Sequence, residues 1–446
     1  MKNDRKHVVI VGGGFAGIHM AKKLYNNPLF NVTVIDQNNY NFFPPLLYQV
    51  ATGFLEVSNI CFPFRKLFQN KTNTFFRLGE LLKIIPEDKK IILTTGEMNY
   101  DYLVLATGTQ TNYFGLENVK KNALPMKTIN DAIEMRNYLL QIAEQATITT
   151  DPEERKKLAT IVIAGGGPTG VEISGMLAEM KKNIFHKDYP ELDINKIHIF
   201  LIDATPVLLT PMSKKSQDYT YHSIVKMGVQ VKLQATVKDY VNDTVILANG
   251  ETIETKTLIW AAGVISKVFE GIPSESFGHA KRMLVDEFNK VKGVSSIYAI
   301  GDTCLQSTDK NFPKGHPQLA QVAIQHGEQL AMNLIAMEQN KPLKPFAYHD
   351  KGSMAIISRN RAVADLPKGL FFKGFAAWMM WLFIHLLSLI NYRNRIKTFY
   401  NWMIAYVTKD QSLRMIIRPE RETKKEGQSI KTNVGKVQGA NDKVRI

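Results

Sequence analysis

Two apolar strands, each running directly into glycines, set the pattern of the chain. The first is Val8–Val11, followed by a stretch of helical spacing at Ile18–Tyr25 and a second apolar strand at Val32–Ile35. The same order returns at Ala159–Ala164, with its own glycines, helix and following strand, His198–Ile202. A strand that leads through a glycine turn into a helix and a second strand is a βαβ unit. The repeat therefore predicts an α/β chain with two Rossmann-type units.

The first glycine turn has the spacing of a dinucleotide-binding loop. In a G-x-G-x-x-G loop the first glycine permits the tight turn, the second lets a pyrophosphate approach the backbone, and the third lets helix and strand pack closely. An acid, Asp36, ends the next strand 19 residues after Gly17, where a carboxylate can accept the ribose hydroxyls of an adenosine. We therefore expect an adenine dinucleotide to contact Gly12, Gly14, Phe15, Ala16, Gly17 and Asp36.

The second glycine turn repeats this arrangement. Gly165, Gly167 and Gly170 stand at the same spacing, and Asp203 ends the following strand. The gap to this acid is 33 residues rather than the usual ~20, and we place the excess in an inserted loop at Lys181–Lys196. An acid here repels a 2′-phosphate and no arginine follows it closely, so we expect NADH rather than NADPH. Two such loops predict two dinucleotides bound face to face, one the redox cofactor and the other its reductant.

Composition narrows the class of protein. Of the 446 residues, 45% are hydrophobic and 22% are charged, which is ordinary for a folded chain of two or three domains. The two cysteines, Cys61 and Cys304, lie far apart and form no C-x-x-C pair. This spacing argues against a dithiol redox centre or a cysteine-based zinc site, and we assign no residue to a metal. It is typical of a reducing compartment that faces the cytosol.

An apolar stretch near the C-terminus predicts attachment to a membrane. Residues Phe371–Ile390 have about the length of a spanning helix, ~20 residues, but Lys373 and His385 interrupt them. Tryptophans and tyrosines cluster here, and the last 81 residues carry 15 Lys or Arg against 5 Asp or Glu, which is +10 of the net +15. We therefore expect an amphipathic helical anchor on an anionic membrane surface, with a transmembrane helix as the alternative. Nucleic acid is disfavoured as a partner because the basic residues accompany apolar ones and no recognition module is visible.

Further motifs are similar to those of one flavoprotein family. They are a block after the second strand (residues 36–51), the A-T-G strand end Leu105–Gly108, its counterpart Trp260–Gly263, the segment Tyr298–Asp302, and the A-Q-x-A-x-Q run Ala320–Gln325. With the two glycine loops, these motifs make about residues 6–418 resemble the type II NADH dehydrogenases, single-chain NADH:quinone oxidoreductases with two dinucleotide-binding domains. The resemblance implies a glutathione-reductase-like flavoprotein fold, FAD in the first domain and NADH, as substrate, in the second.

The resemblance also implies roles for particular residues and partners. A membrane quinone, menaquinone or ubiquinone, would be the acceptor, and the protein would be a homodimer. Glutamate is more usual in the family where Asp203 stands, and the shorter acid should still reach the ribose. Beyond the first loop, FAD contacts would be Thr107, Gly108, Gly301, Asp302, Leu319 and Ala320, and NADH contacts would be Gly165, Gly167, Gly170, Asp203 and Gly263.

Three side chains are candidates for the chemistry. Glu172 lies in the first turn of the second nucleotide helix, where a carboxylate can also simply favour a helix N-terminus. Similar enzymes have a glutamate here, between nicotinamide and flavin. Gln321 and Gln325 share one helix face and, taken alone, are typical of exposed helix residues, but neutral amides can also hydrogen-bond quinone carbonyls in an apolar pocket. The resemblance favours the functional interpretation of all three.

We divide the chain into five segments. Residues 1–115 and 264–365 would form the FAD-binding domain, 116–263 the NADH-binding domain, 366–419 the membrane-anchoring helices and 420–446 a disordered polar tail. The expected function is NADH oxidation by hydride transfer to FAD, with electrons passed to a membrane quinone without proton pumping, at the cytoplasmic face of the cell membrane. Two alternatives stay open. One is a quinone reductase with another donor such as sulfide, against which the isolated cysteines argue, and the other is a membrane-docked NADH-binding or redox-sensing flavoprotein.

Overall fold

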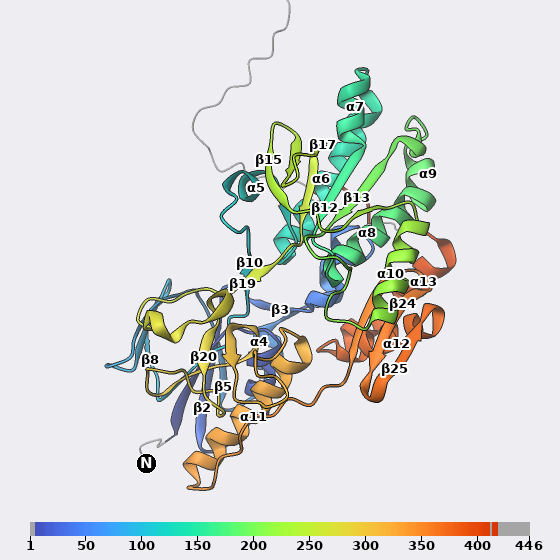
Figure 1. Ribbon diagram of the computed structural model, residues 1–446. Helices are drawn as coiled ribbons and strands as arrows, with labels where there is room; N and C mark the ends of the chain where they lie inside the picture. The colour runs from blue at the N-terminus through green and yellow to red at the C-terminus, as the bar shows by residue number, and fades with distance from the viewer. Residues whose placement is uncertain (1–4, 411–412, 418–446) are drawn as a thin grey trace, which may run out of the picture.

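The first lobe is built on a parallel sheet that contains the first glycine loop. The computed structural model describes residues 5–410 and 413–417, so the tail expected at 420–446 lies outside the described residues. The sheet has five strands in the order β21-β9-β1-β2-β5 within this part of the chain, and Figure 1 labels β2 and β5. The chain leaves the sheet after β9 and returns at β21, so two separate parts of the sequence build this lobe. The bounds are β1 Lys6–Val11, β2 Phe30–Asp36, β5 Thr74–Leu78, β9 Tyr102–Leu105 and β21 Ile297–Ala299.

The second lobe repeats this architecture around the second glycine loop. Its sheet has the order β11-β18-β12-β13-β14, and every residue of β12 and β18 is buried, as expected for parallel strands covered on both faces. The bounds are β11 Leu124–Pro125, β12 Thr160–Ala164, β13 His198–Ile202, β14 Gln230–Lys232 and β18 Thr257–Trp260. Each lobe also has an antiparallel meander, with β6 Leu81–Ile85, β7 Lys90–Leu93 and β8 Gly96–Asn99 in the first and β15 Val237–Val241, β16 Thr244–Leu247 and β17 Thr252–Glu254 in the second.

Four long helices position the glycine loops. The loops lead directly into α1, Phe15–Lys23, and α8, Pro168–Met180. Helix α11, Ala320–Glu338, packs against α1, and the two backbones approach so closely that a Cβ added at Gly327 would collide with the Ala16 carbonyl. Helix α6, Ile129–Ile148, opens with a capping box in which Thr128 and Asp131 exchange hydrogen bonds, and this fixes the segment that enters the second lobe.

The C-terminal unit combines a small antiparallel sheet with two helices. Strands β23 Ser353–Ser358, β24 Arg361–Leu366 and β25 Leu370–Lys373 precede α12 Gly374–Ser388 and α13 Tyr392–Thr408. The sheet packs on α8 of the second lobe, where a Cβ added at Gly175 would collide with the Ile357 carbonyl. The segment boundary that we placed at residue 366 falls inside β24, so the sheet and the helices after it form one unit.

The apolar stretch expected to be one helix is divided between a strand and a helix. Its first residues pair with β24 as β25, and the strand ends at Lys373, just before Gly374, whose φ of +67° is unfavourable for other residues. The remaining helix α12 has 15 residues, or about 22 Å at 1.5 Å per residue, against a hydrocarbon core of about 30 Å. Among the described residues, no helix has the length and apolar character needed to cross a bilayer.

A second expectation also needs correction. The inserted loop expected at Lys181–Lys196 begins as helix, because η2, Lys181–Phe185, continues α8 with one π-helical turn and buries Ile184 and Phe185. Helix α9, His186–Asp188, and the turn η3, Ile194–Lys196, complete the segment. The remaining elements are β3 Tyr40–Phe42, β4 Cys61–Pro63, β10 Gln110–Thr111, β19 Val264–Ile265, β20 Met283–Val285, β22 Cys304–Gln306, η1 Pro44–Leu46, η4 Ser274–Ser276, η5 His279–Lys281, η6 Gly301–Thr303, η7 Pro367–Gly369, α2 Leu47–Ala51, α3 Val57–Ile60, α4 Phe64–Leu67, α5 Glu117–Asn122, α7 Pro152–Leu158 and α10 Lys214–Lys226.

Candidate functional site

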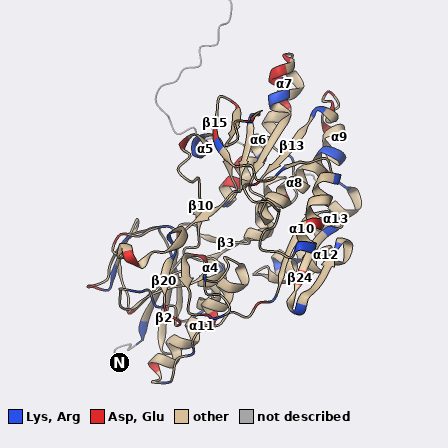
Figure 2. Ribbon diagram, in the orientation of Figure 1, with Lys and Arg blue, Asp and Glu red and all other residues tan. Residues whose placement is uncertain are grey.

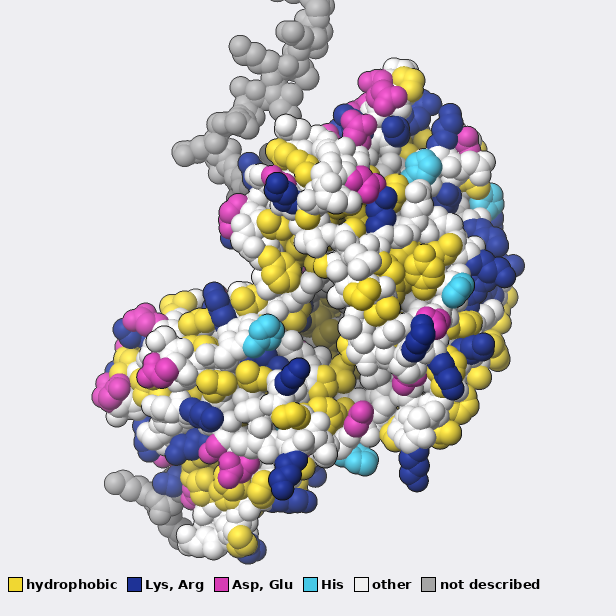
Figure 3. All heavy atoms as spheres, in the orientation of Figure 1, with side chains coloured by type: hydrophobic (Ala, Val, Ile, Leu, Met, Phe, Trp, Pro, Cys, Tyr) yellow, Lys and Arg dark blue, Asp and Glu magenta, His cyan; other side chains and the backbone are white. Residues whose placement is uncertain are grey.

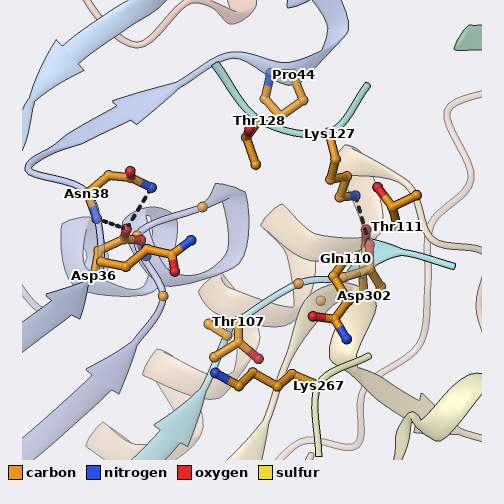
Figure 4. Close-up of a pocket in the computed structure, with 18 of the residues that line it drawn as sticks. Asp36, Asn38, Pro44, Thr107, Gln110, Thr111, Lys127, Thr128, Lys267 and Asp302 are labelled. Carbon is orange, nitrogen blue, oxygen red and sulfur yellow. Dashed lines mark hydrogen bonds between the residues drawn. The ribbon is translucent and has the colours of Figure 1, made fainter. Parts of the chain in front are cut away.

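A cavity of about 980 Å³ opens at the first glycine loop, and the molecule is hollowed between its two lobes (Figure 3). The loop after β1, the end of β9 and the turn after β21 meet here, because the carboxyl ends of parallel strands lie at one edge of the sheet. Asp36 lies at one end of the cavity and Asp302 at the other (Figure 4). Of the residues expected to bind FAD, those that line the cavity are Gly12, Gly14, Phe15, Ala16, Asp36, Thr107, Gly108, Gly301, Asp302 and Ala320.

The two glycine loops have the same geometry. Gly12 and Gly165 have φ of +107° and +114°, and their N–H groups donate to the carbonyls of Ile35 and Ile202, both at 2.8 Å. The third glycines, Gly17 and Gly170, pack so closely that an added Cβ would collide with the carbonyls of the first glycines. In contrast, a Cβ at either second glycine, Gly14 or Gly167, would meet no heavy atom within 4 Å. These second glycines leave the open space that a pyrophosphate requires.

The acids that follow the two loops are also held alike. Asp36 Oδ2 accepts a hydrogen bond from the N–H of Gly13 at 2.7 Å, and Asp203 accepts one from the N–H of Gly166. The other oxygen of each acid accepts from the N–H two residues later, at 2.8 Å in the first lobe and 2.6 Å in the second. Burial raises the pKa of Asp36, and these hydrogen bonds partly offset the effect by favouring the carboxylate. Each acid is thus fixed beside its glycine loop.

The end of the large cavity at Asp302 is polar, and one of its hydroxyl groups has no hydrogen-bond partner in the described residues. Burial raises the pKa of Asp302, while Lys127 and Arg282 oppose the shift. The buried hydroxyl of Thr107, at the end of β9, has no hydrogen-bond partner in the described part of the chain. An elongated cavity with a glycine loop, an acid at each end and an unpaired hydroxyl fits FAD, which carries phosphates and sugar hydroxyls along its length. Lys127 follows no recognisable motif, and sequence reasoning missed it.

A second cavity, of about 390 Å³ and mostly apolar, contains Glu172. It lies between α8, α2 and the helices α12 and α13, and Tyr48, Gln49 and Trp402 also line it. Gln49 Oε1 accepts a hydrogen bond from Trp402 Nε1 at 2.8 Å, and Gln49 Nε2 donates to the Tyr48 hydroxyl at 2.8 Å. Burial raises the pKa of Glu172 well above its usual value. Burial therefore favours the protonated form of this carboxyl.

Gln321 and Gln325 lie on one face of α11, but their amides are already engaged. Gln321 Nε2 donates to the Gly352 carbonyl at 2.8 Å, and Gln321 Oε1 accepts from the N–H of Lys351 at 3.2 Å. Gln325 makes the same pair of bonds with the backbone of His349, at 2.9 and 3.0 Å. Neither residue is among those lining the two cavities. The amides that we expected to be free for a quinone instead fasten the segment leading to β23, and their contact with quinone stays a prediction.

Leu319 and Gly263 are among the expected contacts that do not line the large cavity. Leu319 does not line it and packs instead with Val322, Phe346 and Tyr348. Gly263 accepts a hydrogen bond from the N–H of Asn112 at 3.0 Å, and the Phe114 ring lies against it. The second glycine loop and Asp203 do not line this cavity either, and their contact with NADH stays a prediction.

The cysteines do not form a redox pair in the structure. Both are free, Cys61 on β4 and Cys304 on β22. Burial raises the pKa of each thiol to about 12, so neither is a thiolate at neutral pH.

Comparison with known proteins identifies the family. A model of the pyridine nucleotide-disulphide oxidoreductases matches residues 6–327, and a model of the NDH2 C-terminal domain matches residues 350–416. The chain is 36% identical to the type II NADH:quinone oxidoreductase NdhA of Mycobacterium tuberculosis, over 90% of this chain and 87% of the relative. It is 32% identical to the oxidoreductase Ndh of the same organism, over 91% and 89%.

A solved structure confirms the expected fold. The NDH2 of Plasmodium falciparum, in complex with NADH, superposes with a TM-score of 0.84 at 24% identity, covering 93% of this chain and 100% of that one. A sulfide:quinone oxidoreductase of Aquifex aeolicus shares the fold less closely, with a TM-score of 0.69 at 20% identity. The chain is therefore a pyridine nucleotide-disulphide oxidoreductase in fold and belongs to the type II NADH:quinone oxidoreductase family.

Proposed function

We propose that the protein oxidises NADH at the second glycine loop and delivers the electrons, by way of FAD in the large cavity, to a membrane quinone in the apolar cavity. FAD held in that cavity would supply the redox chemistry, which is hydride acceptance from NADH and electron release to a quinone. The observation that carries the proposal is the position of Glu172. Its helix α8 begins at the second glycine loop, and its side chain lies in an apolar cavity lined by the C-terminal helices.

The residues of the two loops would bind and orient the dinucleotides. The N–H groups at the start of α1 and α8 offer partial positive charge to a pyrophosphate. Gly14 and Gly167 leave space for it, and the two acids accept ribose hydroxyls. Asp203 would also repel a 2′-phosphate, so we expect NADH to be preferred to NADPH.

Glu172 would supply a proton to the quinone. Reduction of a quinone to a quinol by two electrons consumes two protons. Glu172 would give one of them, and water at the mouth of the cavity would give the second and then return a proton to Glu172. No hydrogen-bond or ion-pair partner of the Glu172 carboxyl is found among the described residues, and burial raises its pKa, which favours the protonated form. A neutral acid that faces an apolar cavity can donate a proton, and it places no charge in the cavity until it does so.

The C-terminal helices would place this cavity on a membrane. Helices α12 and α13 expose large apolar side chains, among them Phe383 and Tyr400, each with 63% of its surface exposed. Basic residues, coloured blue in Figure 2, occur on and beside these helices, among them Lys373, Arg393 and Lys397. Apolar bulk with adjacent cations is typical of an interfacial anchor on anionic lipid. We therefore propose peripheral attachment at the cytoplasmic face of the cell membrane, and we expect a homodimer from the family resemblance.

The test is the oxidation of NADH by the purified protein with two acceptors. We expect turnover with both a short-chain quinone and a soluble dye, and Glu172→Gln should lose quinone turnover while it keeps FAD and the dye reaction. A protein that binds FAD and NADH but reduces neither acceptor would instead be a redox sensor. Turnover with sulfide and not with NADH would contradict the proposed donor.

A further inference from the structure

We propose that Lys127 is a cationic ligand of the FAD, reaching from the second lobe into the cofactor cavity beside Asp302. The inference rests on the proposed FAD site and adds a residue to it. It is based on the ammonium group of Lys127, which lies at the cavity wall and has fewer hydrogen-bond acceptors from the protein than it has N–H donors.

The backbone of Lys127 is fixed by the second lobe. The residue lies between β11 and α6, and its N–H donates to Asp131 Oδ2 at 2.8 Å, next to the capping box of α6. Its side chain, however, crosses to the first lobe, where Nζ donates to Thr109 Oγ1 at 2.8 Å. Thr109 follows Gly108 after the A-T-G strand end, so the lysine joins the two lobes at the wall of the cavity.

The ammonium group is only partly satisfied by the protein. Lysine has three N–H donors, and Thr109 accepts from one of them. No carboxylate lies within ion-pair distance of Nζ in the described residues, although Asp302 is near enough to oppose the effect of burial, which lowers the pKa of Lys127. Lys127 is half-buried at the cavity wall, so its remaining donors face the cavity, and the arrangement favours a ligand with acceptor oxygens there.

The position of Lys127 indicates which part of the cofactor it would meet. Asp36, assigned to the adenosine ribose, lies at one end of the cavity, and Lys127 and Asp302 lie together at the other (Figure 4). The lysine is thus on the flavin side of the site, where the cofactor offers ribityl hydroxyls and ring carbonyls. A fixed cation near a flavin stabilises the added electrons, so Lys127 should raise the reduction potential as well as the affinity.

The chain offers a matched control in the same cavity. Lys267 also lines it, but its Nζ is paired with Glu80 and both side chains are more than 40% exposed. A charge that is paired and exposed to water should contribute little. Lys127→Met and Lys267→Met therefore remove the same group from the same cavity with different expected effects.

The experiment measures the FAD dissociation constant of the apoprotein and the midpoint potential of the bound flavin. Lys127→Met should weaken FAD binding by roughly tenfold or more and lower the potential, because it removes a hydrogen bond from a charged donor. Lys127→Arg should keep most of both properties, and Lys267→Met should remain within about twofold of wild type. Lys127→Gln, which keeps a donor for Thr109 without the charge, provides a folded variant if the methionine variant is unstable, and its potential should also fall.

Two outcomes would overturn the inference. One is a Lys127→Met protein with wild-type FAD affinity and potential. The other is a Thr109→Val protein that reproduces both changes, because the lysine would then act only as a tie between the lobes. If wild type itself bound no FAD, the proposed function would fail first, so the two failures are distinguishable.

Discussion

Replacing Gly167 by alanine should weaken NADH binding without unfolding the protein. A Cβ added there meets no heavy atom within 4 Å, and the φ of −72° suits alanine, so no clash opposes folding. The loss of a glycine N-cap and the gain from a stiffer unfolded chain are each at most about 1 kcal/mol and opposite in sign. The methyl group instead enters the space assigned to the NADH pyrophosphate. Overpacking a site costs about 1–3 kcal/mol, which corresponds to roughly 5- to 150-fold weaker binding.

The assay is the KM for NADH with a soluble dye acceptor, together with the FAD content of the purified variant. We expect a raised KM and full FAD content for Gly167→Ala. Gly14→Ala is the matched control, because its Cβ is equally free of contacts in the first loop. It should lose FAD instead. Wild-type NADH affinity in Gly167→Ala, or loss of FAD in both variants, would refute the assignment of the two loops.

Three further predictions concern other parts of the molecule. Burial raises the pKa of Glu172 in the folded state, so the folded protein holds more protons than the unfolded chain at pH values between the two pKa values. As the pH rises through this window, the free energy of unfolding of wild type should fall by up to about 1.4 kcal/mol per pH unit relative to Glu172→Gln. Parallel unfolding midpoints against pH would contradict this. His326 Nδ1 accepts a hydrogen bond from the buried N–H of Gly301 at 3.2 Å. His326→Leu should therefore lower the stability by about 1–3 kcal/mol and release FAD, whereas His326→Asn should retain FAD because its amide oxygen can take the place of Nδ1. Equal FAD retention in both variants would refute this role. Phe383→Glu should reduce co-sedimentation with anionic vesicles, and Ile148→Glu, at a still more exposed apolar site on α6, should not; equal loss in both would argue against the anchor.

The nucleotide-binding loops could be predicted from the sequence because their geometry is set locally. The first glycine must take a positive φ and the third must touch the first, so the residue types at fixed spacing determine the turn. The acid at the end of the next strand follows from the pairing of two neighbouring parallel strands. These features depend on residues within about one βαβ unit of one another.

The features that the sequence did not reveal depend on distant contacts. Residues Leu370–Lys373 are as apolar as the helix after them, and only pairing with β24 makes them a strand. The shared face of Gln321 and Gln325 was predictable, but the backbone that covers it comes from residues 349–352. Glu172 was a candidate from its position, whereas its cavity needs Tyr48 and Trp402, which are remote from it in the chain.

The most direct test of the account follows the colour of the FAD through one anaerobic cycle. NADH is added to the purified protein on anionic vesicles, and a quinone in the same vesicles is supplied afterwards. The account predicts that NADH bleaches the visible absorbance of the bound FAD and that the quinone restores it, with one quinol formed per NADH oxidised. Absorbance that NADH leaves unchanged, or that stays bleached after the quinone is added, would contradict it.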